Sequence, residues 1–179
     1  NRRGGSSLAS ENICSEVALA RKEKPVVVSF GDVAASGGYY FAVDADSIFA
    51  TPNTITGSIG VFTIIPNMQK FFNNKLGITF DEVSTTPGAD LYTVTKPLTP
   101  TQRQFIQNGV DTTYEQFKQR VAGGRDMNMG YVDSIGQGRV WSGTRALDLG
   151  LVDRMGGLDD AVACAARLAK VDDYRLQEF

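Results

Sequence analysis

Residues 31–40 read GDVAASGGYY, and this stretch decides how the chain around it folds. It follows the apolar run VVVSF at 26–30, which is typical of a strand buried on both faces of a parallel sheet. Ser36 stands among small residues, between that strand and the start of a helix predicted over 36–43. A second buried strand is predicted at 48–50. Strand, helix and strand follow one another here, as they do in a parallel α/β unit.

Helical spacing of apolar residues predicts most of the other elements. The first helix, over 6–22, has an apolar face formed by Leu8, Ile13, Val17 and Ala20. Further helices are predicted over 66–76, 100–121, 129–135, 144–149 and 158–170, and further strands over 78–83 and 139–141. Residues 84–97 show no periodicity and are predicted to form a loop.

The longest predicted helix carries an apolar stripe of the kind usually found in a core. The stripe consists of Phe105, Ile106, Val110, Tyr114 and Phe117. The alternation of strands and helices over the whole length predicts an α/β fold, with a mainly parallel sheet flanked by helices. The length of 179 residues and the apolar content of 42% fit a single domain over 1–179.

The charge and hydropathy of the chain narrow its functional classes. A net charge of -2 and a pI near 5.2 provide no general basic field, so nucleic acid is not expected as a partner. No run approaches the roughly 18 apolar residues of a membrane-spanning helix, and the first residues show no signal-peptide pattern. The piece itself is therefore expected to be soluble.

The chain has two cysteines and no histidine. Cys14 and Cys164 lie far apart in helical patterns without metal-ligand spacing, so we expect buried thiols, no metal site and no cofactor. The absence of histidine removes the usual zinc ligand and the base of Ser-His-Asp and Cys-His sites. An acyl-transfer reaction in this protein would need a different base.

Ser36 is the first candidate for chemistry. A serine between a strand and a helix is exposed at the carboxyl end of the strand, and the following Gly37 permits close approach of a substrate backbone. Amides at the start of a helix favour developing negative charge. The same pattern also fits a serine that only caps the helix, so both interpretations stay open at this point.

Two other segments add hydrogen-bonding groups. Gly4 and Gly5 precede the first helix and offer backbone N–H groups, so this loop and the one at Ser36 could form one oxyanion hole. Residues 54–61 read TITGSIGV, a turn rich in hydroxyls and glycine after a strand. Ser58 in this turn either holds a polar neighbour or satisfies the backbone of the turn.

Together these motifs resemble protease IV, the signal peptide peptidase A family. The matching motifs are GGS at 4–6, AASGGYY at 34–40, TGSIG at 56–60, GRVWSG at 138–143 and GLVD at 150–153. They follow the order and spacing of the family up to about residue 169. The resemblance implies a fold similar to the Clp protease proteolytic subunit and the crotonase superfamily. It also implies a serine endopeptidase that degrades cleaved signal peptides with a Ser/Lys dyad.

The resemblance gives each candidate residue a role. Ser36 matches the nucleophile, and the amides of Gly37 and of Gly5 in the Gly4-Gly5 loop match the oxyanion hole. Ser58 matches the position whose hydroxyl orients the amine of the catalytic lysine. The two late motifs match structural signatures, to which we assign no chemistry.

The chain departs from the family pattern in two places. The family usually reads Asn-Ser-Pro-Gly-Gly-Ser at the oxyanion loop, whereas residues 1–6 read NRRGGS and lack the stiffening proline. In members with one repeat the lysine lies in the stretch that corresponds to 84–90, which contains no lysine here. Lys96, the nearest lysine downstream, is expected to be a solvated loop residue. The chain therefore resembles the C-terminal half of a long member whose upstream homologous half carries the lysine.

The same resemblance implies a location and partners. It places the protein at the bacterial cytoplasmic membrane, on the extracytoplasmic side, as a homo-oligomer that binds signal peptides and other apolar peptides. Two other functions stay open. A crotonase-like acyl-CoA enzyme would share the fold and the twin-amide oxyanion hole but would need a glutamate near the thioester. A diverged half without catalytic activity would serve only assembly.

Overall fold

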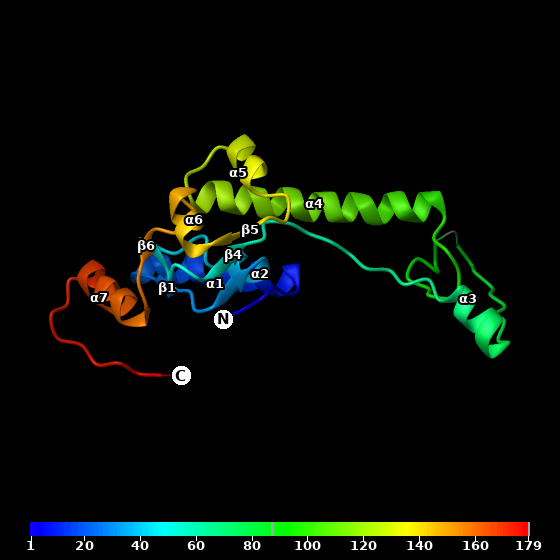
Figure 1. Ribbon diagram of the computed structural model, residues 1–179, viewed down its shortest axis with the longest axis horizontal. Coiled ribbons are helices and arrows are strands. Elements are labelled where there is room, and N and C mark those ends of the chain that lie inside the picture. Colours follow the sequence, from blue (N-terminus) through cyan, green and yellow to red (C-terminus); the bar gives the residue numbers. More distant parts are fainter. Residues whose placement is uncertain (87, 179) are drawn as a thin grey trace. The chain divides into compact units, whose positions relative to one another are not determined.

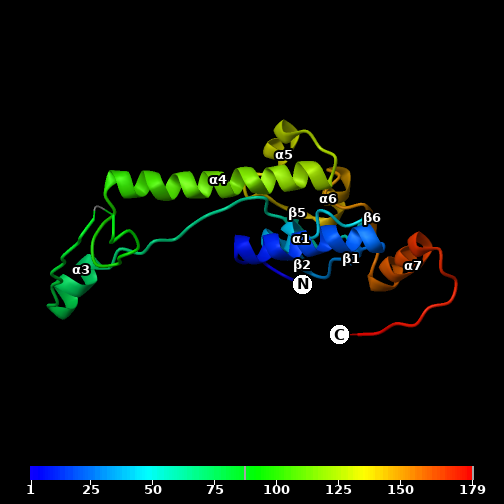
Figure 2. The same ribbon diagram turned by 180° about the vertical axis from the view of Figure 1, so that it is seen from behind.

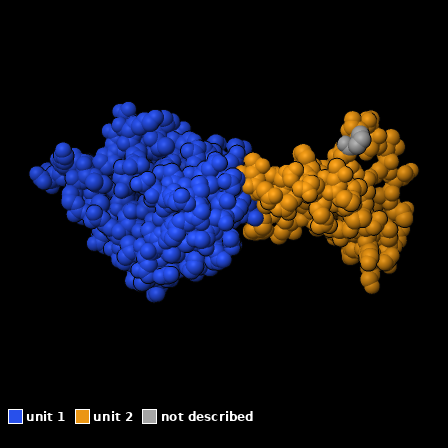
Figure 3. Space-filling view, turned by 90° about the horizontal axis from the view of Figure 1, so that it is seen from above, with its two compact units in different colours: residues 1–61, 113–179 blue, residues 62–112 orange. Residues whose placement is uncertain are grey.

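The computed structural model describes residues 1–86 and 88–178 and divides into two compact units (Figure 3). Unit 1 comprises residues 1–61 and 113–179, and unit 2 comprises residues 62–112. Such a division does not distinguish a second domain from an extension of the first one, so the single domain over 1–179 stays a prediction.

Unit 1 is built on two sheets of three strands each. One sheet has the order β1-β3-β6 and is parallel throughout, with β1 (Val27–Ser29), β3 (Ser47–Ala50) and β6 (Arg154–Met155). The other has the order β2-β4-β5, with β2 (Val33–Ala35), β4 (Ile55–Gly57) and β5 (Val140–Ser142). In this sheet β2 and β4 are parallel, and β5 is antiparallel to β4. The predicted α/β fold with mainly parallel strands is confirmed.

Helices surround these strands, as Figures 1 and 2 show from opposite sides. They are α1 (Ser7–Glu23), α2 (Gly37–Tyr40), α4 (Pro100–Gly124), α5 (Met129–Ile135), α6 (Gly143–Asp148) and α7 (Leu158–Ala169). The helices predicted along these segments are confirmed, and so are the strands at β1, β3 and β5. Only the last twelve residues of α4, from Thr113, belong to unit 1.

The strand predictions fail where a short strand lies in no longer apolar run, and where a segment has no buried face. β2, β4 and β6 have two or three residues each and were not predicted, whereas β1, also of three residues, lies in the apolar run VVVSF. The strand predicted over 78–83 is wrong, because these residues have no regular structure and Val83 is 98% exposed. β1 is half-buried at the edge of its sheet, whereas it was predicted to be buried on both faces.

Unit 2 contains little regular structure of its own. It holds α3 (Gln69–Phe71), the π-helix η1 (Phe72–Leu76) and the first part of α4. The helix predicted over 66–76 is confirmed from Gln69 onward, and Gly77 ends it in the left-handed conformation with φ 66°. No apolar side chain among the described residues of unit 2 is buried.

The apolar stripe of α4 is core in only one part of the helix. Phe117 is 3% exposed and packs in the core of unit 1, whereas Phe105 in unit 2 is 64% exposed. The prediction that Phe105 belongs to a core is therefore wrong for this chain. Spacing along a helix identifies an apolar face, but it does not say how far along the helix a neighbouring element covers that face.

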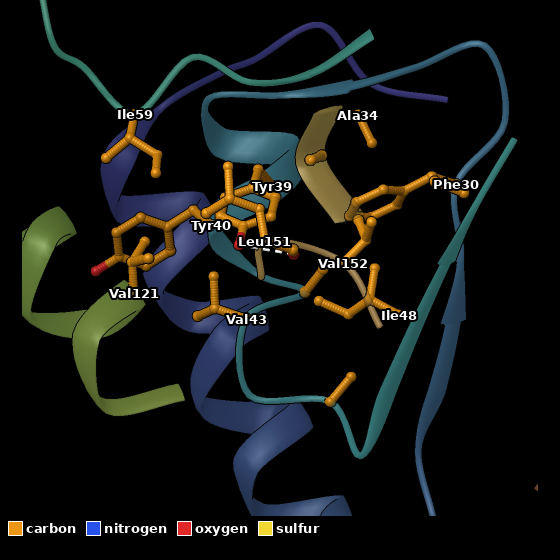
Figure 4. Close-up of a cluster of buried hydrophobic side chains, with 14 of the residues drawn as sticks. Phe30, Ala34, Tyr39, Tyr40, Val43, Ile48, Ile59, Val121, Leu151 and Val152 are labelled. Carbon is orange, nitrogen blue, oxygen red and sulfur yellow. Dashed lines mark hydrogen bonds between the residues drawn. The ribbon is translucent and has the colours of Figure 1, made fainter. Parts of the chain in front are cut away.

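The core of unit 1 forms around α2, the short helix that follows Ser36 (Figure 4). Tyr39 is fully buried, and its hydroxyl donates a 2.9 Å hydrogen bond to the carbonyl oxygen of Leu151. Burial raises the pKa of this phenol, so it stays neutral. The ring of Tyr40 lies 4.8 Å from that of Phe117, measured between centroids. These contacts fix the helix that begins directly after Ser36.

Both thiols are buried, as the sequence predicts. Cys14 donates a 3.2 Å hydrogen bond to Asp44, and burial together with that carboxylate raises its pKa to about 12. Cys164 packs in a smaller cluster with Phe49 and Ala161. A thiol with a raised pKa is a poor nucleophile at neutral pH, so Cys14 does not compete with Ser36 as a catalytic candidate.

Glu11 links three helices of unit 1. Its carboxylate accepts hydrogen bonds from the hydroxyl of Tyr40 on α2 and from the guanidinium of Arg120 on α4. The hydrogen bond from Arg120 holds the pKa of Glu11 below its usual value of 4.5. A carboxyl with a lowered pKa in the folded state stabilises the protein at every pH at which it is ionised.

We expect the substitution Glu11→Gln to destabilise the protein by on the order of 1 kcal/mol at pH 7. The stabilisation is present above the unfolded-state pKa of the carboxyl and is lost as the pH falls through the lower folded-state pKa. The difference in melting temperature between wild type and variant should therefore shrink at about pH 3. Thermal unfolding at both pH values measures it, with Glu16→Gln on the exposed side of α1 as the control. An equal difference at both pH values would contradict this account.

Candidate active site

Ser36 lies at the carboxyl end of β2, where the chain turns into α2. Its φ of 53° and ψ of -121° place a residue with a side chain in a strained region of backbone conformation. Its amide donates a 2.8 Å hydrogen bond to the carbonyl of Gly57, and its carbonyl accepts from the amides of Tyr39 and Tyr40 at 2.9 and 2.8 Å. Hydrogen bonds on both sides of the residue thus hold the strained turn in place.

The hydroxyl of Ser36 does not cap the helix. A capping serine has an extended backbone, and its side-chain oxygen accepts from an amide of the first turn. Ser6 and Ser142 do so at α1 and α6. Ser36 has neither feature, and its hydroxyl makes no hydrogen bond to any other residue that the structure describes. The structure therefore does not support the interpretation of Ser36 as a cap.

The structure brings the Gly4-Gly5 loop against Ser36 and Gly37. A Cβ atom placed on Gly4 would lie 3.7 Å from the Oγ of Ser36. A Cβ atom placed on Gly37 would lie 3.2 Å from the amide nitrogen of Gly5 and 2.5 Å from the Oγ of Ser10. A side chain at position 37 would therefore displace its neighbours, which leaves glycine as the residue that fits. The Gly4-Gly5 loop thus packs closely against Ser36 and Gly37.

Pairing with β2 holds the loop that lacks the proline of the family pattern. The amide of Arg2 donates to the carbonyl of Val33 at 2.6 Å, and the amide of Ala35 donates to the carbonyl of Arg2 at 3.0 Å. The side-chain oxygen of Asn1 accepts from the amide of Val33 at 3.2 Å. Residues 1–3 thus run parallel to β2, and these hydrogen bonds restrain the chain just before Gly4.

Ser58 directly follows β4, just as Ser36 directly follows the neighbouring strand β2. Because Ala35 and Gly57 are in register on the parallel strands β2 and β4, Ser36 and Ser58 follow at the same edge of the sheet. Ser58 also has a positive φ, of 50°, and its amide donates a 2.8 Å hydrogen bond to the carbonyl of Arg139. Its hydroxyl makes no hydrogen bond within the described part of the chain. The hydroxyl is thus not used to satisfy the turn.

Two of the lysines are held as cations by carboxylates. Lys96, in unit 2, pairs with Asp90 and Glu82, and hydrogen bonds to these groups raise its pKa. Its side chain is 38% exposed, as expected for a solvated loop residue, and it is ion-paired as well. Lys118 lies 2.9 Å from Glu115 and 3.2 Å from Asp133, and its pKa is also raised. A general base has to be neutral, so both environments oppose that role. The other five are exposed, namely Lys22, Lys24, Lys70, Lys75 and Lys170.

Other kinds of site find no support in residues 1–86 and 88–178. Their acidic and cysteine side chains form no cluster of three or more that is suited to a metal ion. None of their helices combines the length and the apolar character needed to cross a membrane.

The sequence patterns missed Ser10, which lies beside Gly37 and Gly5. The apolar face predicted for α1 is also wrong at its start, because Leu8 is 70% exposed while Ser10 and Cys14 are buried. Small residues let α1 approach the chain at Gly37 closely, where a leucine would not fit. A spacing of four between two small residues is the sequence signal that could have identified this face.

Known proteins resemble this chain over its whole length. Residues 18–172 match peptidase family S49. The chain is 44% identical to Protease 4 of Salmonella typhi and 40% identical to Protease 4 of Haemophilus influenzae. Both matches cover 100% of this chain and 29% of the relative, so the chain spans less than a third of the length of these proteins.

A solved structure supports the fold. The 1510-N membrane-bound stomatin-specific protease superposes with a TM-score of 0.54 at 15% sequence identity, covering 89% of this chain and 63% of that protein. This likeness concerns the fold alone, and with the strand order described above it confirms the predicted Clp protease/crotonase-like α/β fold. With the family match over 18–172, these findings show that the chain belongs to peptidase family S49, the serine proteases that include protease IV and signal peptide peptidase A.

Proposed function

We propose that this chain carries the nucleophile of a serine endopeptidase that degrades cleaved signal peptides with a Ser/Lys dyad. The observation that carries the proposal is the turn at Ser36. Its hydroxyl does not cap the helix, its backbone is strained, and the Gly4-Gly5 loop packs against it and against Gly37. Strained turns of this kind occur at functional sites, where the surrounding structure stabilises them.

The geometry suits acyl transfer. The Oγ of Ser36 attacks the carbonyl carbon of the scissile peptide bond, and its proton passes to the base. The carbonyl oxygen then takes on negative charge, which the amides of Gly37 and Gly5 stabilise by hydrogen bonds. When the tetrahedral intermediate collapses, the bond to the leaving amine breaks, and the amine receives the proton from the base. Water hydrolyses the acyl-enzyme by the same steps in reverse order.

The base of this mechanism is a lysine outside residues 1–179. With no histidine in the chain, a neutral amine is the plausible partner of the serine. An amine whose usual pKa is about 10.4 needs a desolvated site without a carboxylate partner to be neutral near pH 7. Lys96 and Lys118 have carboxylate partners instead. Ser58 is placed at the same sheet edge as Ser36, where its free hydroxyl can orient the incoming amine.

Family membership supports a proposal for substrate, location and assembly. We propose signal peptides and other apolar peptides as substrates, a homo-oligomeric enzyme, and a site at the extracytoplasmic face of the bacterial membrane. The name of the 1510-N protease describes that protein as membrane-bound, which supports a membrane location for a relative with this fold. Release of the full-length protein from cells without detergent would contradict the membrane location.

The two alternative functions have less support. An acyl-CoA enzyme would need a glutamate near its oxyanion hole, but Glu11, the glutamate next to Ser10, is engaged by Arg120 and Tyr40. A half that serves only assembly has no need for a strained serine with a free hydroxyl. Peptide hydrolysis is the function that uses all of the observed features.

In the full-length protein, Ser36→Ala should reduce peptidase activity by at least about 10³-fold, because the attacking atom is removed. The melting temperature should stay close to that of wild type, since no hydrogen bond of the Ser36 hydroxyl is lost. Turnover of a signal peptide and thermal unfolding measure the two effects, with Ser84→Ala, at an exposed serine, as the control. Comparable turnover by Ser36→Ala and wild type would refute the assignment.

Ser58→Ala should lower turnover while Ser36 still reacts with a fluorophosphonate probe. The loss of one orienting hydrogen bond costs on the order of 1–3 kcal/mol, or about 5-fold to 150-fold in rate. Kinetics and probe labelling of the full-length variant test this role, again beside Ser84→Ala. Wild-type turnover would show that Ser58 is only a residue of the turn. Loss of labelling would show that it does more than orient the base.

Residues 1–179 alone should hydrolyse signal peptide far more slowly than the full-length protein, because the base is missing. The experiment compares both proteins at equal concentration, after circular dichroism has established that the shorter one is folded. Replacement of each upstream lysine by alanine in the full-length protein should identify one whose loss abolishes turnover. Appreciable turnover by residues 1–179 that is lost on Lys96→Ala would instead place the dyad within this chain.

A further inference from the structure

Ser10 on α1 is a buried polar residue beside the two loops of the proposed oxyanion hole. It is 6% exposed, and its Oγ lies 2.5 Å from the position that a Cβ of Gly37 would occupy. The amide nitrogen of Gly5 lies 3.2 Å from the same point. The hydroxyl of Ser10 therefore fills the space next to the Cα of Gly37, where the Gly5 amide also approaches.

The hydroxyl of Ser10 has no hydrogen-bond partner among the described residues, in contrast to the hydroxyls of Thr54 and Thr56. Ser47 is a second buried serine of unit 1 whose hydroxyl has no partner there, but it lies in β3. Thr54 and Thr56 donate 2.7 Å hydrogen bonds to the carbonyls of Gly31 and Ala34. The Ser10 hydroxyl adds no hydrogen bond within the described part of the fold, and alanine is a better helix former than serine. Stability of the fold therefore gives no reason for a serine at position 10.

The neighbours of Ser10 hold it in this place. Glu11 is bound by Arg120 and Tyr40, and Cys14, one helical turn further along, donates to Asp44. These contacts fix α1 against the segment that begins with α2. The backbone at Ser10 therefore cannot move away from Gly37 without breaking the contacts of Glu11 and Cys14.

We propose that Ser10 is a positioning residue of the oxyanion hole. Its hydroxyl keeps the backbones of Gly37 and Gly5 at the separation in which both amides reach the same oxygen. Such donors have to lie about 2.7–3.1 Å from the oxyanion, and a displacement of a fraction of an ångström weakens the transition state more than it weakens substrate binding. The inference rests on the proposed protease function and deepens it.

The test compares Ser10→Ala and Ser10→Thr in the full-length protein. In Ser10→Ala we expect kcat to fall about 10-fold to 100-fold with KM within about twofold of wild type. The inhibition constant of a peptide aldehyde, which forms a tetrahedral adduct with the serine, should rise by a similar factor. The melting temperature should not fall, because no hydrogen bond of the hydroxyl is lost. Ser10→Thr keeps the oxygen and should recover most of the activity, and Ser7→Ala, at the exposed start of α1, is the control.

Several outcomes would overturn the role of Ser10. Wild-type kcat in Ser10→Ala would do so, as would a parallel loss of kcat and melting temperature that threonine does not recover. An increase in KM alone would place Ser10 in substrate binding and would also contradict the proposal. Other results would show that the proposed protease function itself is wrong. In that case the wild-type protein would not react with a fluorophosphonate, or Ser36→Ala would keep its activity.

Discussion

The hydrogen bond from the amide of Ser36 to the carbonyl of Gly57 is the interaction on which the site depends. It extends the pairing of β2 and β4 by one residue, so the chain turns only after the two strands end together. The turn forces Ser36 to a positive φ, and the buried rings of Tyr39 and Tyr40 hold the helix that follows. Gly57 and Ser58 also have positive φ values, so both strands end in a strained turn at one edge of the sheet.

The Gly4-Gly5 loop and the turn at Ser36 lie close together because several elements of unit 1 hold them there. Residues 1–3 pair with β2 and bring Gly4 to Ser36, while α1 brings Ser10 to Gly37. Glu11 then joins α1 to α2 and α4 through Tyr40 and Arg120. The arrangement is consistent with amide donors fixed before substrate arrives, which is how enzymes stabilise charge in the transition state without reorganisation.

Long elements and the motif around Ser36 could be predicted from the sequence, because their spacing and residue types repeat over many positions. Examples are the helices α1, α4 and α7 and the strand β3, all of which the sequence predicts. β2 and β4 were not predicted, because their three residues lie in no longer apolar run, although they are the strands that position both serines. The exposure of Leu8 and Phe105 could not be predicted, because spacing identifies an apolar face of a helix but not whether another element covers it. The carboxylates around Lys96 come from residues 6 and 14 positions away, which local patterns do not bring together.

The central claim is that Ser36 is the reactive nucleophile of the protein. Peptide mapping by mass spectrometry, after reaction of the full-length protein with a fluorophosphonate, tests it most directly. The account predicts a single adduct on the peptide that contains Ser36, whose formation a signal peptide slows by competition. An adduct on another serine, such as Ser58, or equal labelling in the unfolded protein, would contradict the account.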